Sequence, residues 1–338
     1  MKPKNKQIKI RHHHVWDYYL KRWSLDKKNI WYTSSKHNKI SFDSTKGLAR
    51  EDSFYKISYI SKEQAQIIKR FSSKSSESLH KLHMSWLDDF LFIQFLEDTY
   101  KSSGRKVPEF EEDIEIRQHN MLENLHTKHE SDARYIIDEL ANHNLNILED
   151  RTNMIKFMIY FGHQISRTKT FKETVMAANR NVTEDDGLVI TNVMRDCWWF
   201  FSYMFGMSFG QNIYLGKDKG NQCLLINNTD EPFITSDQPI VNVHSCTYSQ
   251  DEALIPPEFS DFFYPISPTI GYMINDSNEF GKGIQNVSLE TVQKLNSKVA
   301  SHANLHIFGS TNEVVKRYKN LVGDNLKKVL KHTESAPL

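Results

Sequence analysis

The order in which hydrophobic periodicities change along this chain constrains its fold more than any other feature. Between residues 8 and 59 the pattern is strand-like, with β-branched and aromatic runs such as NIWYTS (29–34) and SFYKISYI (53–60). Helical spacing then dominates the middle of the chain, and short strand-like runs return from residue 223. This order predicts an α+β fold with a β-rich N-terminal segment, a helical middle and a C-terminal part of mixed antiparallel strands and helices.

The boundaries follow from the breakers between these runs. We predict one α+β domain over 1–338, with subregions 1–71 (β-rich), 79–210 (helical) and 211–338 (mixed β/α), and SSKSSES (72–78) as a loop or hinge. The expected helices are 85–100, 108–148 as one helix or two, 151–168, a helix from Asp185 or Asp186 towards Met207, about 289–303 and about 312–331. The expected later strands are 223–228, 232–237, 239–244, 262–267, 270–274 and 305–309.

Charge and cysteine content exclude several classes of protein. The formal net charge of +1 argues against wholesale electrostatic binding to DNA or to an anionic membrane. Three cysteines without CxxC spacing fit neither a disulfide framework nor a zinc finger, and they favour a reducing compartment. The apolar run 197–209 is too short to cross a bilayer. We therefore expect a cytoplasmic protein without a membrane partner.

Several stretches of the chain carry motifs that recur together in one bacterial family. The opening HHHVWDYYLKRW is similar to that family's His-His pair and Phe-Tyr-Leu-Arg run, with Trp16 in place of the usual proline. KNIWYTSSK is similar to a family strand, and HQISRTKTFKE resembles the Gln-x-x-Arg-Thr-Pro segment, with Lys169 in place of proline. FITSDQPIV, YPISP and ANLHIF match later elements. From His12 to about Phe308 the chain therefore resembles the DUF4238 family of uncharacterised proteins, and the resemblance implies little about function.

Two groups of polar residues stand in places where burial is expected. Gln164 continues an apolar helical stripe, and Arg167 lies three residues further on. A buried guanidinium needs partners, so Arg167 forms either a structural ion pair, with Asp237 as one candidate, or an anion clamp. The strand in FITSDQP ends at polar residues, where Ser236 and Asp237 are either ligand groups or an Asx-turn.

The histidines divide into two groups. In a strand from residue 8 to 20, His12 and His14 share one face and His13 takes the other, so adjacent histidines cannot both bind one metal unless the backbone kinks there. A further set is expected to be solvated: His80, His119, His126, His129, His143 and His332. His126, His129 and Glu130 also have the spacing of a metal cluster on one helix face, but a solvated face is favoured because the HExxH order is absent.

These residues support two hypotheses. In the first, the chain is a hydrolase, in its specific form a nuclease acting as a bacterial defence or toxin effector on RNA or DNA. His12 or His13 is then the general acid/base, Gln164 orients the anion clamp Arg167, and Asp237 orients the histidine or binds a divalent cation, Mg or Mn. Thr235 and Ser236 are the expected substrate-binding residues.

In the second hypothesis, the same polar network is structural or receives a small ligand, and the chain is a non-catalytic binding module. The strongly acidic helix at 108–148 then provides a surface for a protein partner, for instance a basic one. Nucleotide binding of the Rossmann or P-loop type is unsupported, because neither GxGxxG nor GxxxxGK[ST] is present.

Overall fold

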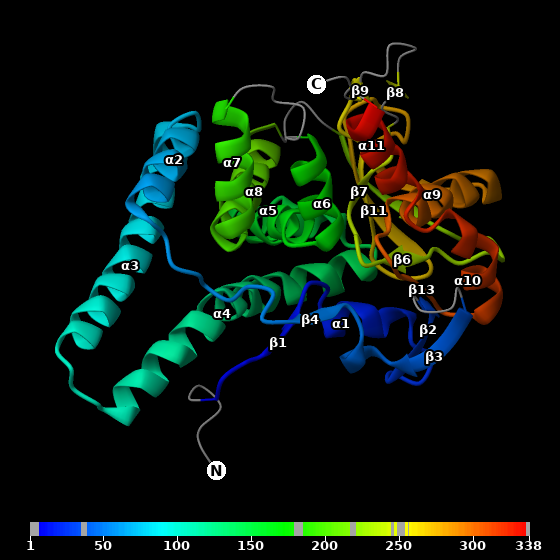
Figure 1. Cartoon of the computed structure of the whole chain (residues 1–338). Coiled ribbons are helices and arrows are strands. Elements are labelled where there is room, and N and C mark those ends of the chain that lie inside the picture. Colours follow the sequence, from blue (N-terminus) through cyan, green and yellow to red (C-terminus); the bar gives the residue numbers. More distant parts are fainter. Residues whose placement is uncertain are drawn as a thin grey trace.

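A computed structural model describes residues 7–34, 39–178, 185–216, 221–244, 247–248, 254–255 and 257–335. It confirms the α+β class, with a short N-terminal strand segment, a helical middle and a C-terminal mixed sheet with helices. In Figure 1 the helices of the middle lie on one side and the strands gather on the other, with the long helix α4 running beneath both. The last helices return to the strand side.

The helical middle is more extensive than the sequence indicated. Its helices are α2 (Lys62–Ser72), α3 (Glu77–Ser102), α4 (Pro108–Ala141), α5 (Arg151–Ser166), α6 (Lys169–Ala178), α7 (Asp185–Asp196) and α8 (Trp198–Gly216). The remaining helices are α1 (Asp17–Leu20), α9 (Leu289–His302), α10 (Asn312–Tyr318) and α11 (Asp324–Ser335), with 3-10 turns η2 (Lys21–Trp23), η3 (Thr45–Gly47), η4 (Leu145–Leu148) and η5 (Lys319–Leu321). Thus 108–148 is one α-helix followed by a short turn, and the expected helix from 185 to 207 is two helices.

Two larger sheets and two strand pairs complete the described part of the chain. The five-stranded sheet has the order β12 (Gly283–Asn286), β5 (Asn221–Ile226), β11 (Ile270–Asn275), β10 (Phe262–Pro265) and β7 (Val241–Asn242). The four-stranded sheet has the order β3 (Lys39–Ser44), β2 (Asn29–Ser34), β13 (Ile307–Gly309) and β6 (Thr235–Ser236). The pairs are β1 (Arg11–His13) with β4 (Arg50–Asp52), and β8 (Thr247–Tyr248) with β9 (Leu254–Ile255). Only β12 with β5 is a parallel pair in these sheets.

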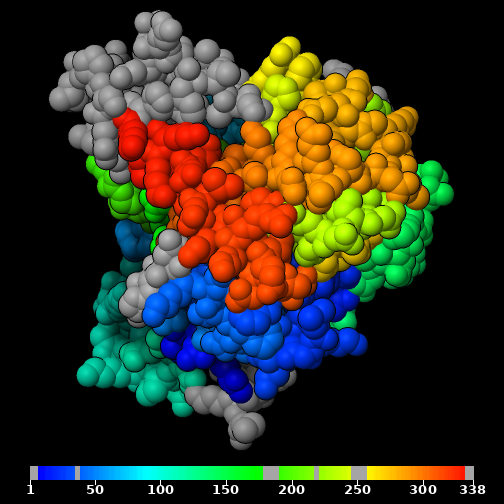
Figure 2. Space-filling model, turned by 90° about the vertical axis from the view of Figure 1, so that its right-hand side faces the viewer, coloured from blue at the N-terminus to red at the C-terminus, as the bar shows by residue number. Residues whose placement is uncertain are grey.

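The four-stranded sheet joins the two ends of the chain. Strand β13 lies between β2 and β6 and is antiparallel to both, with Phe308 opposite Tyr32 and also opposite Thr235. Figure 2 shows the N-terminal segment, in blue, packed directly against the C-terminal helices, in orange and red. The structure therefore brings residues near 30 and near 307 to the same place.

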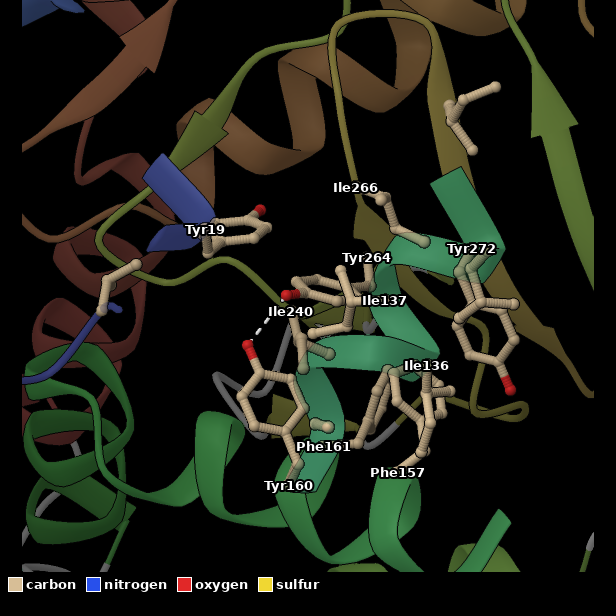
Figure 3. Close-up of a cluster of buried hydrophobic side chains, with 14 of the residues drawn as sticks. Tyr19, Ile136, Ile137, Phe157, Tyr160, Phe161, Ile240, Tyr264, Ile266 and Tyr272 are labelled. Carbon is tan, nitrogen blue, oxygen red and sulfur yellow. Dashed lines mark hydrogen bonds between the residues drawn. The ribbon is translucent and has the colours of Figure 1, made fainter. Parts of the chain in front are cut away.

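Aromatic side chains from helices and strands pack together within one cluster of buried residues. Phe157, Tyr160 and Phe161 of α5 pack against Tyr264 and Tyr272 of the five-stranded sheet, and all five are at most 2% exposed. In Figure 3 the hydroxyl groups of Tyr160 and Tyr264 face one another, at 2.9 Å. This contact satisfies both polar ends inside an apolar cluster, as buried tyrosines require.

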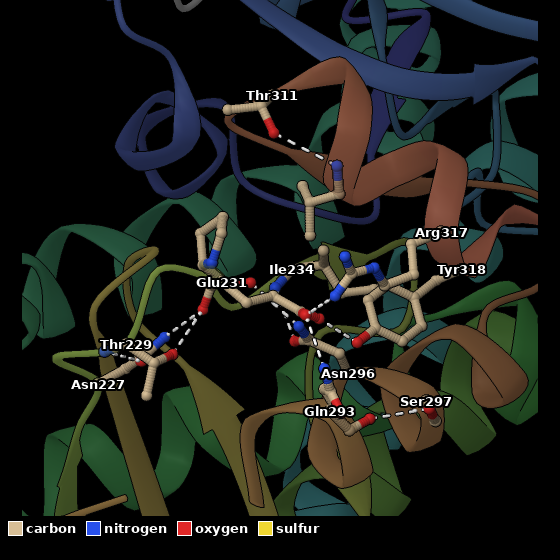
Figure 4. Close-up of polar contacts among 12 residues, drawn as sticks. Asn227, Thr229, Glu231, Ile234, Gln293, Asn296, Ser297, Thr311, Arg317 and Tyr318 are labelled. Atoms are coloured by element: carbon tan, nitrogen blue, oxygen red, sulfur yellow. Dashed lines mark hydrogen bonds and ion pairs between the residues drawn. The ribbon is translucent and has the colours of Figure 1, made fainter. Parts of the chain in front are cut away.

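A buried carboxylate attaches the last helices to the sheet region. Glu231 is 7% exposed and accepts hydrogen bonds from Arg317 and Tyr318 of α10 and, at 3.1 Å, from Gln293 of α9 (Figure 4). Asn296 of α9 also donates to the backbone carbonyl of Pro232. Removing this carboxylate would leave several polar groups without their partner at once.

Three strand predictions are wrong in detail. Residues 53–60 form a turn and an extended segment without sheet pairing; Ile57 donates its N–H to the Gln118 carbonyl, and Ile60 donates to the Gln94 side chain. The expected strand from 8 to 20 ends after His13 and is followed by helix α1. The segments 232–237 and 239–244 contain only the two-residue strands β6 and β7. In the first of these cases helices, rather than a neighbouring strand, supply the hydrogen-bond partners.

Two expectations from composition can be compared with the structure. Cys197 and Cys223 are free and buried, and Cys246 lies outside the described residues. Among the described helices, none combines the length and the apolar character needed to cross a bilayer.

Candidate functional site

Five of the segments that resemble the family line one cavity of about 290 Å³. Among the residues they contribute are His14 from the opening motif, Lys169 from the start of α6 and Asp237 from the loop after β6. The other lining residues are Tyr32, Ser34, Gly47, Leu48, Ala49, Arg50, Glu51, Leu305 and His306. Two other cavities, of about 130 and 440 Å³, are lined in part by α3 and contain none of the family-like segments. The 290 Å³ cavity is therefore the candidate site.

His306 has the geometry of a general base. Its Nδ1 lies 2.6 Å from the carbonyl oxygen of Thr33, which can only accept, so Nδ1 carries the proton. In the neutral ring, Nε2 is then the nitrogen with a free lone pair. The Thr33 carbonyl thus fixes the tautomer and orientation of the ring. In many catalytic histidines a carboxylate that accepts the Nδ1–H has the same role.

Asp237 holds the loop that carries this histidine. Its carboxylate accepts backbone N–H groups from Asn304 and Leu305, both at 2.8 Å, and from His306 at 3.0 Å. The N–H of Asp237 in turn donates to the His306 carbonyl. Burial raises the pKa of this carboxyl, while the facing imidazole and the amide donors oppose that rise. Asp237 thus positions a histidine through its backbone, and its oxygens are already engaged rather than open to a cation.

The cavity also holds cationic side chains. Lys169 forms an ion pair with Glu51 at 3.4 Å, and both side chains are partly exposed. Arg50 is half-buried and, among the described residues, has no ion pair or side-chain hydrogen bond. The negative charge of Asp237 is already stabilised by three backbone N–H groups and does not require Arg50 as a partner. The Arg50 guanidinium is therefore available to bind an anion in the cavity.

His14 is the histidine of the opening triplet that reaches the cavity. It is 8% exposed, and its Nδ1 has no partner. Burial, together with the charge of Arg167, lowers the pKa of His14 to about 3, so the ring is neutral at physiological pH. It supplies a neutral polar wall rather than a charge.

His12 and His13 occupy other environments. His12 is fully buried; its Nε2 donates to the Lys9 carbonyl at 2.7 Å, and its Nδ1 accepts the N–H of Tyr55 at 2.8 Å. Both ring nitrogens are therefore used by the backbone. His13 is half-buried and has one long contact, 3.4 Å, to the Lys46 carbonyl. Burial lowers the pKa of both rings, and neither residue lines the cavity.

Gln164 and Arg167 form a buried polar cluster beside the cavity. Arg167 is 2% exposed, donates to Gln164 Oε1 at 2.5 Å and forms an ion pair with Glu130 of α4 at 2.7 Å. Gln164 donates to the His14 carbonyl at 2.9 Å and so connects α5 to the opening motif. Burial opposes the charge of Arg167, but Glu130 keeps its pKa above the usual range. The suggested ion pair with Asp237 is wrong, because Glu130 takes that place.

The two expected substrate-binding residues are fully buried. Thr235 Oγ1 lies 2.6 Å from the Tyr19 hydroxyl. Ser236 Oγ donates to the Gln238 carbonyl and accepts the Gln238 N–H, which is a local turn of the kind that hydroxyl side chains make. Neither lines the cavity.

The expectation of solvated histidines is wrong for the inner face of α4. His119 and His126 are 6% and 3% exposed, and His129 is half-buried. His80 and His143 are partly exposed and exposed, and the side chain of His332 lies outside the described part. The correction follows from packing, because His163 of α5 lies against His126 and His129, while His12 of the N-terminal segment lies against His119.

Together these positions bring some of the predicted site residues near one another and separate others. Asp237 lines the cavity and Gln164 contacts its rim through His14, whereas Arg167 and His12 are enclosed. The residue that the sequence reasoning missed is His306. A signal was present, because His306 lies within ANLHIF, one of the family-like segments.

Comparison with known proteins gives a family match for part of the chain. Residues 205–313 match the family model described as a protein of unknown function, DUF4238. This match supports the resemblance to the DUF4238 family over those residues. The DUF4238 match includes Asp237 and His306, while the resemblance of the segment from His12 to residue 204 comes from the sequence motifs alone. No curated protein and no solved structure matches the chain.

Proposed function

We propose that this protein is a hydrolase that cleaves a phosphodiester in the cavity around His306. The observation that supports the proposal is the His306 ring, whose Nδ1–H is fixed on the Thr33 carbonyl and whose Nε2 is left as an acceptor in a cavity that also holds Arg50. A general base must present a correctly oriented lone pair before substrate binds, and the contact of Nδ1–H with the Thr33 carbonyl leaves Nε2 as that acceptor.

The remaining residues take roles that follow from their contacts. Arg50 and Lys169 bind the phosphate oxygens and stabilise the charge that develops on them. Asp237 positions His306 through the 304–306 backbone, so it is a positioning residue rather than a base. In this proposal His306 replaces His12 and His13 as the general base, and Arg50 replaces Arg167 as the anion clamp.

The substrate class follows from the same charges. A phosphodiester offers the single negative charge that one unpaired guanidinium and one partly neutralised lysine can accept. RNA or DNA is the substrate to test first, and action as a bacterial defence or toxin effector in the cytoplasm is the fuller form of the proposal. An added Mg or Mn ion would have to be held by groups other than Asp237, because the oxygens of that carboxylate accept backbone N–H groups.

The experiment measures hydrolysis of bis(p-nitrophenyl) phosphate, RNA and DNA, each with Mg²⁺, Mn²⁺ or a chelator. His306→Asn keeps an amide donor near the Thr33 carbonyl but removes the base, so the rate should fall about 10²–10⁴-fold. Arg50→Ala should lower it about 10²–10³-fold. Matched controls are His143→Asn and Arg105→Ala, which change exposed residues of the same types.

The outcomes separate the alternatives. Loss of activity in both cavity variants, with unchanged melting temperatures and active controls, supports the hydrolase. Wild-type protein without activity on all three substrates, or a His306→Asn variant with full activity, overturns it.

A second candidate function is a binding module, and an exposed acidic face favours it. Glu109, Glu111, Asp113 and Glu115 are all exposed in the first two turns of α4. Like charges at this density attract a basic protein surface, with an association that salt weakens. Salt-dependent binding of a basic protein partner that Glu111→Lys abolishes, without turnover of any substrate, would favour this function.

A further inference from the structure

A second group of polar residues, separate from the cavity, lies where α4 faces α5. His126 and His129 are three residues apart on α4 and so point to one side of that helix, and His163 faces them from α5. The ring centroid of His163 lies 4.6 Å from that of His129 and 5.5 Å from that of His126. One ligand atom from each of the three residues lies within 4.8 Å of the others.

The nitrogens of this cluster have no protein partners. Nδ1 of His126 and of His129, and both nitrogens of His163, are buried without a hydrogen bond. His163 is 2% exposed, so water does not readily replace the missing partners. A buried polar group without a partner is costly, and native proteins rarely retain four such atoms side by side. This unpaired cluster therefore indicates a ligand that all three rings share.

The surroundings favour a cation over other ligands. A neutral imidazole has one nitrogen lone pair, and the unpartnered nitrogens of these rings leave it uncommitted to any protein donor. The charge of the nearby Arg167 is compensated by Glu130 at 2.7 Å. A neutral cluster of lone pairs suits a metal ion, whereas an anion would meet no free donor cation there.

We propose that His126, His129 and His163 bind one late first-row divalent metal ion, such as Zn²⁺. Imidazole nitrogens suit Zn²⁺, Co²⁺, Ni²⁺, Cu²⁺ and Fe²⁺, whereas Mg²⁺ and Mn²⁺ prefer oxygen. Ligands on facing helices are a common way to build such a centre in a helical bundle. Three protein ligands leave a fourth position for water or another small ligand, as in catalytic zinc sites.

The geometry needs only a small adjustment. Tetrahedral zinc with bonds of about 2.0–2.1 Å places its nitrogens about 3.3 Å apart, against the limit of 4.8 Å here. The donor atoms therefore have to approach one another by at most about 1.5 Å when the ion binds. On the opposite side, Tyr203 of α8 stacks on His163 with centroids 5.9 Å apart, and its hydroxyl also lacks a partner.

The first measurement uses full-length protein treated with a chelator and then titrated with CoCl₂ and ZnCl₂. We expect one Co²⁺ per chain, with the visible absorption of four- or five-coordinate cobalt, displacement by Zn²⁺ and a higher melting temperature with either metal. His129→Ala should weaken binding at least about 100-fold, since even loss of an outer partner costs 10–100-fold. His129→Cys should keep the ion and add a thiolate charge-transfer band.

The controls make each outcome decisive. His143→Asn removes an exposed histidine elsewhere and should leave binding unchanged. Because the His129 ring is the half-buried member, its variants should fold, and their melting temperatures without metal verify this. Wild-type protein that binds no stoichiometric Co²⁺, or His129→Ala that binds it as tightly as wild type, overturns the proposal. The site shares no residue with the cavity, so a failed hydrolase assay does not decide it.

Discussion

Breaking the ion pair between Arg167 and Glu130 should reveal how strongly the interior depends on it. The two side chains are 2% and 11% exposed and 2.7 Å apart. Arg167→Met leaves a buried carboxylate, and Glu130→Leu leaves a buried guanidinium whose remaining acceptor is the neutral Gln164. Each single change should therefore lower the free energy of unfolding by about 3–5 kcal/mol.

The double variant Arg167→Met/Glu130→Leu should be less destabilised than the sum of the two single variants, because neither charge is left alone. A coupling energy of at least about 2 kcal/mol is expected. With an unfolding entropy of about 2.1 cal/mol/K per residue, a 338-residue chain loses about 4–7 °C of melting temperature for 3–5 kcal/mol.

The assay is urea denaturation followed by tryptophan fluorescence, with calorimetry for the melting temperature. The control is Glu77→Leu, which breaks the exposed pair with Lys81, whose side chains are 81% and 74% exposed, and should cost about 0–1 kcal/mol. Single variants within 1 kcal/mol of wild type, or a double variant equal to the sum, would show that Arg167 is not held as a buried ion pair.

Three further predictions concern packing, loop anchoring and pH. Gly206→Ala should lower the free energy of unfolding by about 1–3 kcal/mol in chemical denaturation, because the added Cβ would lie 2.4 Å from His163 Nδ1. Asp237→Asn should cost about 1.5–3 kcal/mol in the same assay, since an amide cannot accept all three backbone N–H groups. His14 has a folded pKa of about 3, against 6.5 unfolded, so between pH 6.5 and 5 the unfolded state takes up a proton and the folded state does not. His14 alone should lower the free energy of unfolding by about 2 kcal/mol between pH 6.5 and pH 5. In His14→Gln, the free energy of unfolding should fall by that much less over the same pH range.

Each of these has its own control and its own contrary result. Gly47→Ala adds a Cβ with no atom within 4 Å and should be nearly neutral; equal loss in both glycine variants would argue against the packing explanation. Asp276→Asn changes an exposed carboxylate and should cost less than Asp237→Asn. A His14→Gln profile parallel to wild type between pH 5 and 7 would show that this ring is not the group that stays neutral.

The sequence predicted the fold class because it depends on local periodicity. The helix from Pro108 and the strands at 223–228, 262–267, 270–274 and 305–309 were readable from local pattern, whereas α6 and β12 were not predicted. Helix α2 was missed although Ser61 and Gln64 form a capping box at its start, because the strand-like run before it obscured the signal. The prediction failed because of the residues that precede α2, not because residues 62–72 have a weak helix propensity.

The site was harder to predict because its contacts join distant residues. His306 and Thr33 are separated by 273 positions, and the tautomer that matters depends on that one contact. The histidines of α4 looked solvated because the helix is acidic and polar on most sides, and only its packing against α5 shows that its inner face is buried. Spacing alone cannot reveal which face a neighbouring helix covers.

During synthesis, the cavity can form only after β13 has been translated and has paired with β2. Its walls come from residues near 14, 50, 237 and 306, so a nascent chain lacks a complete site until residue 306 has left the ribosome. Pairing across such a sequence separation is slow to form. A translation product that stops before residue 306 would therefore contain most of the described helices but could not complete the cavity.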